Sequence, residues 1–213
     1  MLRSGLYCEQ CAIQVLPSTT HCPGCGGPSA TSEFCAKCGI QGPIFQGVTS
    51  AFEYGGVVAD TVAGLKFRRA TDVARRLAAT CILPNGVDWD VLIPVPLHPS
   101  RLRARGYNQS ALLAHYIGRR HRLVVDVVSL QRVRATPPQR GLSEIARRSN
   151  VHGAFKVTEA AQRHGGLVGR RILLIDDVMT TGATLAACAR ALRSVQPAAV
   201  GAWVVAHRSQ PTV

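Results

Sequence analysis

The sequence predicts an α/β protein with a parallel, Rossmann-like sheet, preceded by a small cysteine-rich module. Beyond residue 43, short apolar runs alternate with segments of helical periodicity, which is typical of a parallel sheet. Residues 6–42 are rich in Cys, Gly, Pro, Ser and Thr, so something other than a hydrophobic core must hold them. A length of 213 residues suffices for one large core and such a module. We therefore divide the chain into residues 1–42 and 43–213.

The individual elements follow from apolar periodicity and from chain breakers. Strands are expected at residues 45–54, 90–96, 123–130, 151–157, 171–175 and 200–206. Helices are expected at residues 57–67, 72–83, 108–118 and 182–194. An arginine-rich loop is expected at 96–108. A long loop that includes at most one helical turn is expected at 132–150, which lacks a clean period. Long loops inside compact domains are usually functional or mobile.

The positive charge is concentrated in one part of the chain. The formal net charge is +13, and the four charged residues among the first 50 cancel, so the whole excess lies beyond residue 50. Residues 101–148 carry eleven arginines against Asp126 and Glu144. Such a segment predicts phosphate-bearing partners, either a small molecule or a nucleic acid.

The cellular compartment is predicted from two features that were sought in the sequence, a membrane span and a secretory signal. No segment approaches the roughly 20 apolar residues of a membrane-spanning helix, so no membrane span is expected. The residues before Cys8 are too few and too polar for a secretory signal. We therefore expect a cytoplasmic protein.

Six of the eight cysteines form three Cys-x-x-Cys pairs, and such pairs in a reducing compartment usually bind metal. Two pairs, each followed by glycine, resemble zinc knuckles that together complete a structural Zn²⁺ site: Cys22, Cys25, Cys35 and Cys38. The third pair, Cys8 and Cys11, either replaces one knuckle or is left over. A redox disulfide is disfavoured because no thioredoxin-like βαβ pattern surrounds any pair. Cys81 and Cys188 lie in apolar surroundings and are expected in the core.

A candidate anion site follows the apolar run at 171–175. Asp176 and Asp177 come next, then the Thr/Gly segment 180–184, then a helix. Parallel sheets bind ligands beyond the carboxyl ends of their strands, and helix N-termini favour anions. Alternatively, the acids and threonines are only helix caps. Two adjacent acids, however, repel each other without a partner such as hydroxyl groups or a metal ion. The absence of a GxxxxGK[ST] loop excludes the usual nucleoside triphosphatase.

Residues 174–184, Leu-Ile-Asp-Asp-Val-Met-Thr-Thr-Gly-Ala-Thr, resemble the fingerprint by which type I phosphoribosyltransferases bind phosphoribosyl diphosphate (PRPP). The resemblance implies that Asp176 and Asp177 contact the ribose hydroxyls. It also implies that the following segment holds PRPP and its 5′-phosphate: Val178, Met179, Thr180, Thr181, Gly182, Ala183 and Thr184.

Further motifs are similar, in order, to the ComF subgroup, which also carries cysteine knuckles ahead of the transferase domain. They are Leu65-Lys66-Phe67, Ile93-Pro94-Val95-Pro96-Leu97, Arg105-Gly106-Tyr107-Asn108-Gln109, and the spaced residues Gln139, Arg147, Asn150 and Phe155. The resemblance covers nearly the whole chain.

This resemblance implies a mechanism. An acceptor attacks the anomeric carbon of PRPP while diphosphate leaves, with Mg²⁺ bound to PRPP and catalysis mostly by positioning and charge stabilisation. Asp176, Asp177 and Arg105 are the candidate catalytic residues, with Arg105 the best candidate for the diphosphate. Gln139 and Arg147 are candidate PRPP contacts from a 132–150 lid.

Two functions are compatible with these observations. One is a phosphoribosyltransferase whose acceptor the sequence does not name. The other is a PRPP-binding factor without turnover that associates with single-stranded DNA, since ComF relatives are associated with DNA uptake and hence with competence or DNA-processing proteins. Candidate nucleic-acid contacts are the arginines outside the phosphate motifs: Arg119, Arg120, Arg122, Arg132 and Arg134. A glutamine amidotransferase is disfavoured because no N-terminal nucleophilic cysteine is present.

Overall fold

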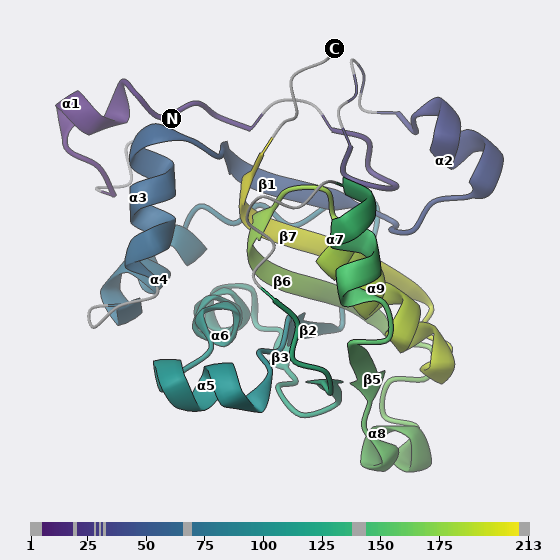
Figure 1. The fold of residues 1–213 in the computed structure, drawn as a ribbon. Coiled ribbons are helices and arrows are strands. Elements are labelled where there is room, and N and C mark those ends of the chain that lie inside the picture. Colours follow the sequence, from purple (N-terminus) through teal and green to yellow (C-terminus); the bar gives the residue numbers. More distant parts are fainter. Residues whose placement is uncertain are drawn as a thin grey trace.

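A five-stranded parallel sheet forms the centre of the molecule (Figure 1). The computed structural model describes residues 6–18, 21–27, 29, 31, 33–65, 70–137 and 144–208, apart from the side chains of residues 70, 144, 145, 147 and 148. The strand order is β1-β7-β6-β2-β3 and every pairing is parallel. This confirms the predicted α/β class. The strands are β1 Val48–Glu53, β2 Val91–Pro94, β3 Val124–Val125, β6 Arg171–Met179 and β7 Ala199–His207.

Helices cover both faces of the sheet (Figure 1). One face packs against α3 Gly56–Gly64, α4 Ala70–Ala78 and α6 Gln109–His121, and the other against α7 Glu144–Val151 and α9 Ala183–Leu192. Side chains of β6 alternate between the two cores: Ile172 and Leu174 join one, and Leu173 and Ile175 the other. A strand buried on both faces is apolar throughout, which is why this run could be recognised in the sequence.

Smaller elements surround this frame. A two-stranded antiparallel ribbon pairs β4 Leu130–Arg132 with β5 Phe155–Val157. The remaining helices are α1 Glu9–Ala12, α2 Ala36–Gln41, α5 Pro99–Arg105 and α8 Glu159–His164, with a 3₁₀ turn at Arg193–Val195. Cys81 and Cys188 are buried, as expected. None of the described helices is long and apolar enough to cross a membrane.

The prediction of an arginine-rich loop at 96–108 was wrong, because part of this segment forms α5. His98 caps the helix by accepting a hydrogen bond from the backbone N–H of Ser100, and Pro99 occupies the first helical position. Gly106 ends the helix in the left-handed conformation, with φ of 83°. The local chemistry therefore specifies a short helix that the high arginine content obscured.

The single strand predicted at 123–130 is instead divided between two sheets. The Asp126 carboxylate accepts hydrogen bonds from the backbone N–H groups of Val128 and Ser129, both at 2.9 Å, and this turn separates β3 from β4. The prediction at 151–157 was also too long, since Val151 ends α7 and Gly153 has a positive φ of 64°. Helix α8 was not predicted; Thr158 caps it through its side chain.

Strand β6 continues four residues beyond the predicted end at Ile175. Asp176 pairs with Val204 of β7, and Met179 pairs with His207. The two acids are therefore part of the strand and do not follow it. The backbone ladder fixes their positions more tightly than a loop would.

Candidate functional site

Two buried carboxylates lie at the carboxyl end of β6. Asp176 and Asp177 are 8% and 9% exposed. One oxygen of Asp176 accepts hydrogen bonds from the Ser110 hydroxyl and from the Asp177 N–H, both at 2.9 Å. Asp177 accepts from the Val178 N–H at 2.8 Å and from the Gln109 side-chain amide at 3.4 Å. The first turn of α6 thus directs neutral donors at the pair, a role for Ser110 that the sequence analysis missed.

The buried position of Asp176 changes its ionisation. Burial, followed by the neighbouring charge of Asp177, raises the pKa of Asp176 to about 8. The hydrogen bonds from Ser110 and from the Asp177 N–H favour the carboxylate but do not offset these effects. Burial therefore favours the protonated form of Asp176 over a wider pH range than for an exposed aspartate. A ligand that donates hydrogen bonds to Asp176 favours release of this proton.

The segment between β6 and α9 forms an open helix N-terminus. Gly182 is the N-cap, in the left-handed conformation with φ of 70°, and offers no side chain to cap the helix. The hydroxyl of Thr181 is buried and has no hydrogen-bond partner within the described parts of the chain. A Cβ at Gly182 would lie 2.6 Å from Met179 Cε, so both backbone angle and space require glycine.

The alternative in which the acids are only helix caps is not supported. Asp176 and Asp177 hydrogen-bond to β6 itself and to the start of α6, on another element of the fold. The α9 N-terminus is left for a different acceptor. Backbone amides there, together with an unpartnered hydroxyl, suit an anion such as phosphate.

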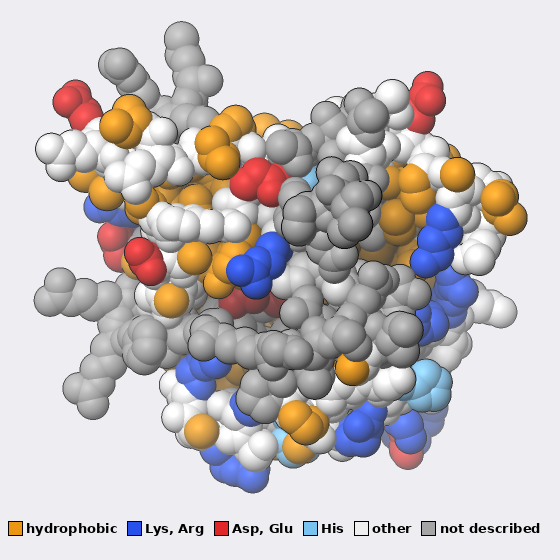
Figure 2. Space-filling view, turned by 45° about the horizontal axis from the view of Figure 1, so that its top comes forward, with side chains coloured by type: hydrophobic (Ala, Val, Ile, Leu, Met, Phe, Trp, Pro, Cys, Tyr) orange, Lys and Arg blue, Asp and Glu red, His pale blue; other side chains and the backbone are white. Residues whose placement is uncertain are grey.

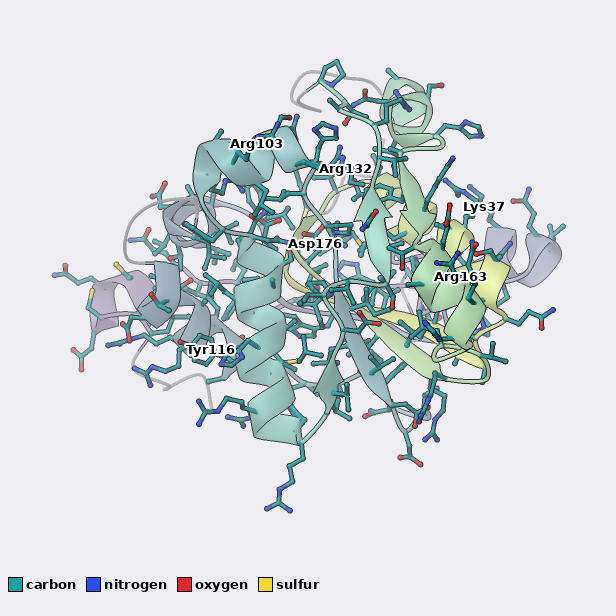
Figure 3. The ribbon with its side chains drawn as sticks, turned by 90° about the horizontal axis from the view of Figure 1, so that it is seen from below. Lys37, Arg103, Tyr116, Arg132, Arg163 and Asp176 are labelled. Carbon is teal, nitrogen blue, oxygen red and sulfur yellow. The ribbon has the colours of Figure 1, made fainter. Side chains whose placement is uncertain are left out.

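Arg105 connects the basic helix α5 to the acid pair. Its guanidinium donates to the Gln109 side-chain oxygen at 2.6 Å, and the Gln109 amide in turn reaches Asp177. Arg101 donates to the Thr136 carbonyl at 2.7 Å, while Arg103 is exposed (Figure 3). Of these three arginines of α5, Arg105 alone has a described hydrogen-bond route to the acids.

Arg132 was predicted to be a surface contact for nucleic acid, and this was wrong. It is 8% exposed, donates to the Thr136 hydroxyl, and lies with its guanidinium carbon 5.3 Å from the centre of the Phe155 ring. Burial and the nearby Arg101 charge lower its pKa, whereas Asp176 favours its charged form. Its Nε atom has no partner among the residues described. Figure 3 shows Arg132 and Asp176 in the same central region. The sequence did contain a signal for this burial, because residues two apart on a strand share a face and Arg132 therefore shares the face of buried Leu130.

The predicted lid is described only at its ends. Gln139 lies outside the described residues, and the side chain of Arg147 is likewise outside them, although its backbone belongs to α7. Asn150 donates from its side-chain amide to the Pro137 carbonyl at 3.1 Å, and Arg134 donates to the Asn150 carbonyl at 3.1 Å. These bonds hold the two ends of the segment together.

The motif residues Lys66 and Phe67 also lie outside the described part.

Acidic side chains lie in a hollow on the face shown in Figure 2, and Lys and Arg side chains lie on either side of it.

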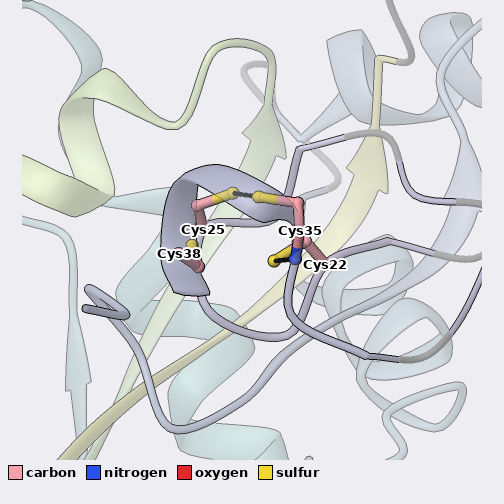
Figure 4. Close-up of side chains that lie close together, drawn as sticks. All are labelled: Cys22, Cys25, Cys35 and Cys38. Atoms are coloured by element: carbon pink, nitrogen blue, oxygen red, sulfur yellow. Dashed lines mark hydrogen bonds between the residues drawn. The ribbon is translucent and has the colours of Figure 1, made fainter. Parts of the chain in front are cut away.

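A second cluster, of sulfur atoms, lies in the N-terminal region. The four thiols of Cys22, Cys25, Cys35 and Cys38 lie within 4.8 Å of one another (Figure 4). The Cys25 and Cys35 sulfurs are 3.8 Å apart, and tetrahedral Zn²⁺ with bonds of about 2.3 Å requires about 3.8 Å.

Backbone N–H groups support this arrangement. The Gly27 N–H donates to the Cys25 sulfur at 3.4 Å and the Cys35 N–H to the Cys22 sulfur at 3.2 Å. Burial opposes ionisation of Cys22, but the backbone N–H groups around its sulfur outweigh burial and lower its pKa to about 7. Burial and the surrounding thiols raise the pKa of Cys38. Four ionised thiols in this space need a cation, so the cluster can hold a metal ion such as zinc.

The pair Cys8 and Cys11 lies elsewhere. Both belong to the region of α1, on the opposite side of the molecule from α2, which carries Cys38 (Figure 1). They are not among the thiols of the four-cysteine cluster. The structure therefore assembles the favoured set of cysteines and leaves the third pair apart.

The four-cysteine cluster touches the candidate phosphate site. A Cβ added to Gly26 would lie 2.3 Å from Met179 Cε, and the Cys25 carbonyl oxygen lies 3.5 Å from the equivalent position on Gly182. Glycine at both positions permits this close packing. The knuckle thus supports the outer side of the β6–α9 segment.

The sheet, the paired acids and the open helix N-terminus define a phosphoribosyltransferase-like protein, and residues 122–213 match the phosphoribosyl transferase domain family. The chain is 31% identical over 205 residues to the DNA utilization protein YhgH of Escherichia coli (strain K12), covering 92% of this chain and 88% of that protein. It is 29% identical over 218 residues to competence protein F of Haemophilus influenzae, covering 96% and 91%. It is 27% identical over 199 residues to competence protein ComFC of Bacillus subtilis, covering 87% and 77%. The chain therefore belongs to the ComF family of type I phosphoribosyltransferase-like proteins.

The raised pKa of Asp176 predicts a pH-dependent stability. Because the folded pKa exceeds the unfolded value, stability from the protonated form is present at acidic pH and is lost as pH rises toward 8. Asp176→Asn retains a neutral group and should escape this loss. Its melting temperature relative to wild type should rise between pH 5 and pH 8, by about 2–4 °C per kcal/mol for a chain of this size. A melting-temperature difference independent of pH contradicts the assignment.

The cysteine cluster predicts selective metal loss. Cys35→Ser should contain about one equivalent of zinc less than wild type and should unfold at lower temperature, because three thiolates do not close a structural site. Cys8→Ser is the matched control and should keep the wild-type metal content. Elemental analysis of protein purified under reducing conditions measures both. Loss of zinc in Cys8→Ser, with full retention in Cys35→Ser, would show that other pairs bind the metal.

Proposed function

We propose that this protein binds PRPP together with Mg²⁺ and transfers its phosphoribosyl group to an acceptor, with release of diphosphate. The observation that carries the proposal is the buried, unpartnered Thr181 hydroxyl in the segment that opens α9. An unpaired buried polar group is costly, and a bound phosphate relieves that cost. Thr181 follows Asp176 and Asp177 closely in the chain, and the carboxylates of these two residues suit the hydroxyl groups of a sugar.

The two halves of this site match the two ends of a ribose 5-phosphate unit. Ribose hydroxyls are hydrogen-bond donors, and Asp176 and Asp177 are acceptors already oriented by Ser110 and Gln109. Binding such donors favours the ionised form of Asp176 and so offsets part of the penalty that burial imposes on it. The 5′-phosphate then lies against the amides of the α9 N-terminus.

The reaction needs a charge partner for the leaving group. A bond forms between the acceptor and the anomeric carbon, while the bond from that carbon to the diphosphate oxygen breaks and its electron pair leaves with diphosphate. Arg105 is the proposed contact for this charge, since its link through Gln109 places its guanidinium near the acids. Mg²⁺ bound to the diphosphate would neutralise part of its negative charge. Gln139 and Arg147 remain proposed contacts from the segment between Pro137 and Asn150.

The zinc assignment and the cellular location belong to the same proposal. We assign Zn²⁺ to Cys22, Cys25, Cys35 and Cys38, where it has a structural role because four thiolates leave no open position. Reduced thiols suit a cytoplasmic protein.

PRPP with Mg²⁺ should raise the melting temperature, and ribose 5-phosphate should raise it less because it lacks the diphosphate. The double variant Asp176→Asn with Asp177→Asn should lose at least about tenfold in PRPP affinity, or about 1.4 kcal/mol. Thermal shift with increasing PRPP measures the effect, and released diphosphate, assayed with a panel of bases, amines and oligonucleotides, measures turnover.

Asp60→Asn serves as the matched control, since Asp60 is exposed on α3. It should respond to PRPP as wild type does. Equal stabilisation of wild type and the double variant by PRPP would exclude the β6 acids as the ribose site. Binding without diphosphate release from any acceptor would favour a PRPP-binding factor over an enzyme.

A second candidate function is binding of single-stranded DNA, and one structural feature favours it. Arg119, Arg120 and Arg122 are exposed together at the end of α6. Helix α6 starts beside the acid pair and leads to β3, whose Val124 pairs with Val91 at the start of β2. These arginines therefore lie near the amino ends of the strands, whereas the acids lie near the carboxyl end of β6. Names of relatives such as DNA utilization protein and competence protein are consistent with such a contact, and with DNA-processing partners.

Oligonucleotide binding through these arginines should be insensitive to sequence and should weaken steeply with salt, because contacts to phosphate dominate it. Changing Arg119, Arg120 and Arg122 to Ala should reduce affinity at low salt at least about tenfold. Changing Arg163, Arg170 and Arg193 to Ala removes the same charge elsewhere and should have a smaller effect. Fluorescence anisotropy with a labelled oligonucleotide measures this.

Because the two sites lie at opposite ends of the parallel strands, PRPP should not displace the oligonucleotide. Equal loss of affinity in both triple variants would mean that net charge alone attracts DNA. Competition by PRPP would place the nucleic acid at the carboxyl ends of the strands, near α5.

A further inference from the structure

A second group of metal-binding side chains lies where the N-terminal region meets the sheet. His21 precedes the first knuckle, Glu53 ends β1, and His207 ends β7. One ligand atom from each lies within 4.8 Å of the others. His21 Nε2 is 3.4 Å from a Glu53 carboxylate oxygen, and the two imidazole rings have their centres 3.9 Å apart.

The three side chains are largely buried, and the two imidazole rings lack hydrogen-bond partners among the described residues. The His21 side chain is 6% exposed, that of Glu53 is 14% exposed, and His207 as a residue is 2% exposed. No ring nitrogen of His21 or His207 meets hydrogen-bond geometry with a partner within the described ranges, although the Gly26 backbone lies close enough to His207 to favour its charged form. Buried polar atoms without partners are rare in folded proteins, so this group requires an explanation.

A simple ion pair explains only part of the cluster. His21 and Glu53 are close enough to pair if His21 is protonated. That pairing leaves both nitrogens of His207 unpartnered and places a second imidazole against a cationic ring. Burial disfavours the charged imidazolium, and neutral imidazole is the form that binds metal ions.

We propose that His21, Glu53 and His207 form a second metal site, separate from the four-cysteine cluster, that binds a divalent transition metal of the zinc type. Two imidazoles and one carboxylate are a common ligand set for Zn²⁺. Bonds of about 2.1 Å in a tetrahedron place ligand atoms about 3.4 Å apart, which matches the His21–Glu53 separation. Three protein ligands leave a fourth position for water or for a bound molecule.

The location gives this site two consequences. The metal joins the residue before Cys22 to the ends of β1 and β7, so it fastens the cysteine module to the sheet. His207 also pairs with Met179, the last residue of β6, directly before the candidate phosphate segment. The proposed metal site therefore lies at the end of the strand that neighbours β6, which carries the proposed PRPP site.

Metal content of the full-length chain tests the proposal. Wild type loaded with zinc and then dialysed should retain about two equivalents. His207→Ala should lose about one equivalent and keep the other in the cysteine cluster. Cys35→Ser should also retain about one, in the histidine site. His164→Ala, at an exposed histidine of α8, is the matched control and should retain the wild-type amount.

Cobalt titration of wild type supplies a measurement that needs no variant. Co²⁺ bound to the cysteine cluster gives thiolate-to-metal charge-transfer absorption, whereas Co²⁺ at the histidine site adds visible absorption without further charge transfer. Glu53→Gln is a milder variant that should weaken this second phase. A single zinc equivalent in wild type, or His207→Ala with wild-type metal content, overturns the proposal. These results do not depend on PRPP binding.

Discussion

The burial of two neighbouring carboxylates in the central strand is the constraint on which the candidate site depends. The parallel ladder with β7 fixes Asp176 and its neighbour, so the repulsion between them cannot be relieved by moving apart. Donors from the start of α6 and from β6 itself satisfy part of their hydrogen-bonding capacity. The remaining cost appears in the raised pKa of Asp176. Such a site is costly without its ligand and improves when hydroxyl donors enter.

The N-terminal region contributes to the same end of the sheet. Through Gly26 and the Cys25 carbonyl oxygen it packs on Met179 and Gly182, the residues that frame the start of α9. Two thiols of the proposed zinc site, those of Cys22 and Cys38, are buried in this region. Loss of the metal is therefore expected to reach the phosphate segment through direct contact, because packed interiors transmit displacement.

Much of this organisation could be predicted from the sequence because the signals are local. Residues 172–175, directly before Asp176, are all apolar, and the knuckle spacing of Cys22 through Cys38 predicts the thiol cluster that the structure assembles. The errors have physical causes as well. Helix α5 is specified by a cap and a glycine stop, which a high density of arginine obscured. Arg132 is buried by pairing between β4 and β5, a contact between distant segments that composition cannot reveal.

The least predictable features arise where separate elements meet. Ser110 became a partner of Asp176, 66 residues away in the chain, only through the placement of α6 against β6. His21, Glu53 and His207 come from three distant segments and share no sequence spacing that suggests a cluster. Lone histidines are usually structural, and only their convergence on a carboxylate changes that interpretation.

The most direct test of the account is a crystal structure of the full-length protein with PRPP and Mg²⁺. The ribose hydroxyls should lie within hydrogen-bond distance of Asp176 and Asp177, and the 5′-phosphate should accept bonds from the α9 N-terminus and from the Thr181 hydroxyl. PRPP bound elsewhere on the molecule, with that hydroxyl still unpartnered, would contradict the account.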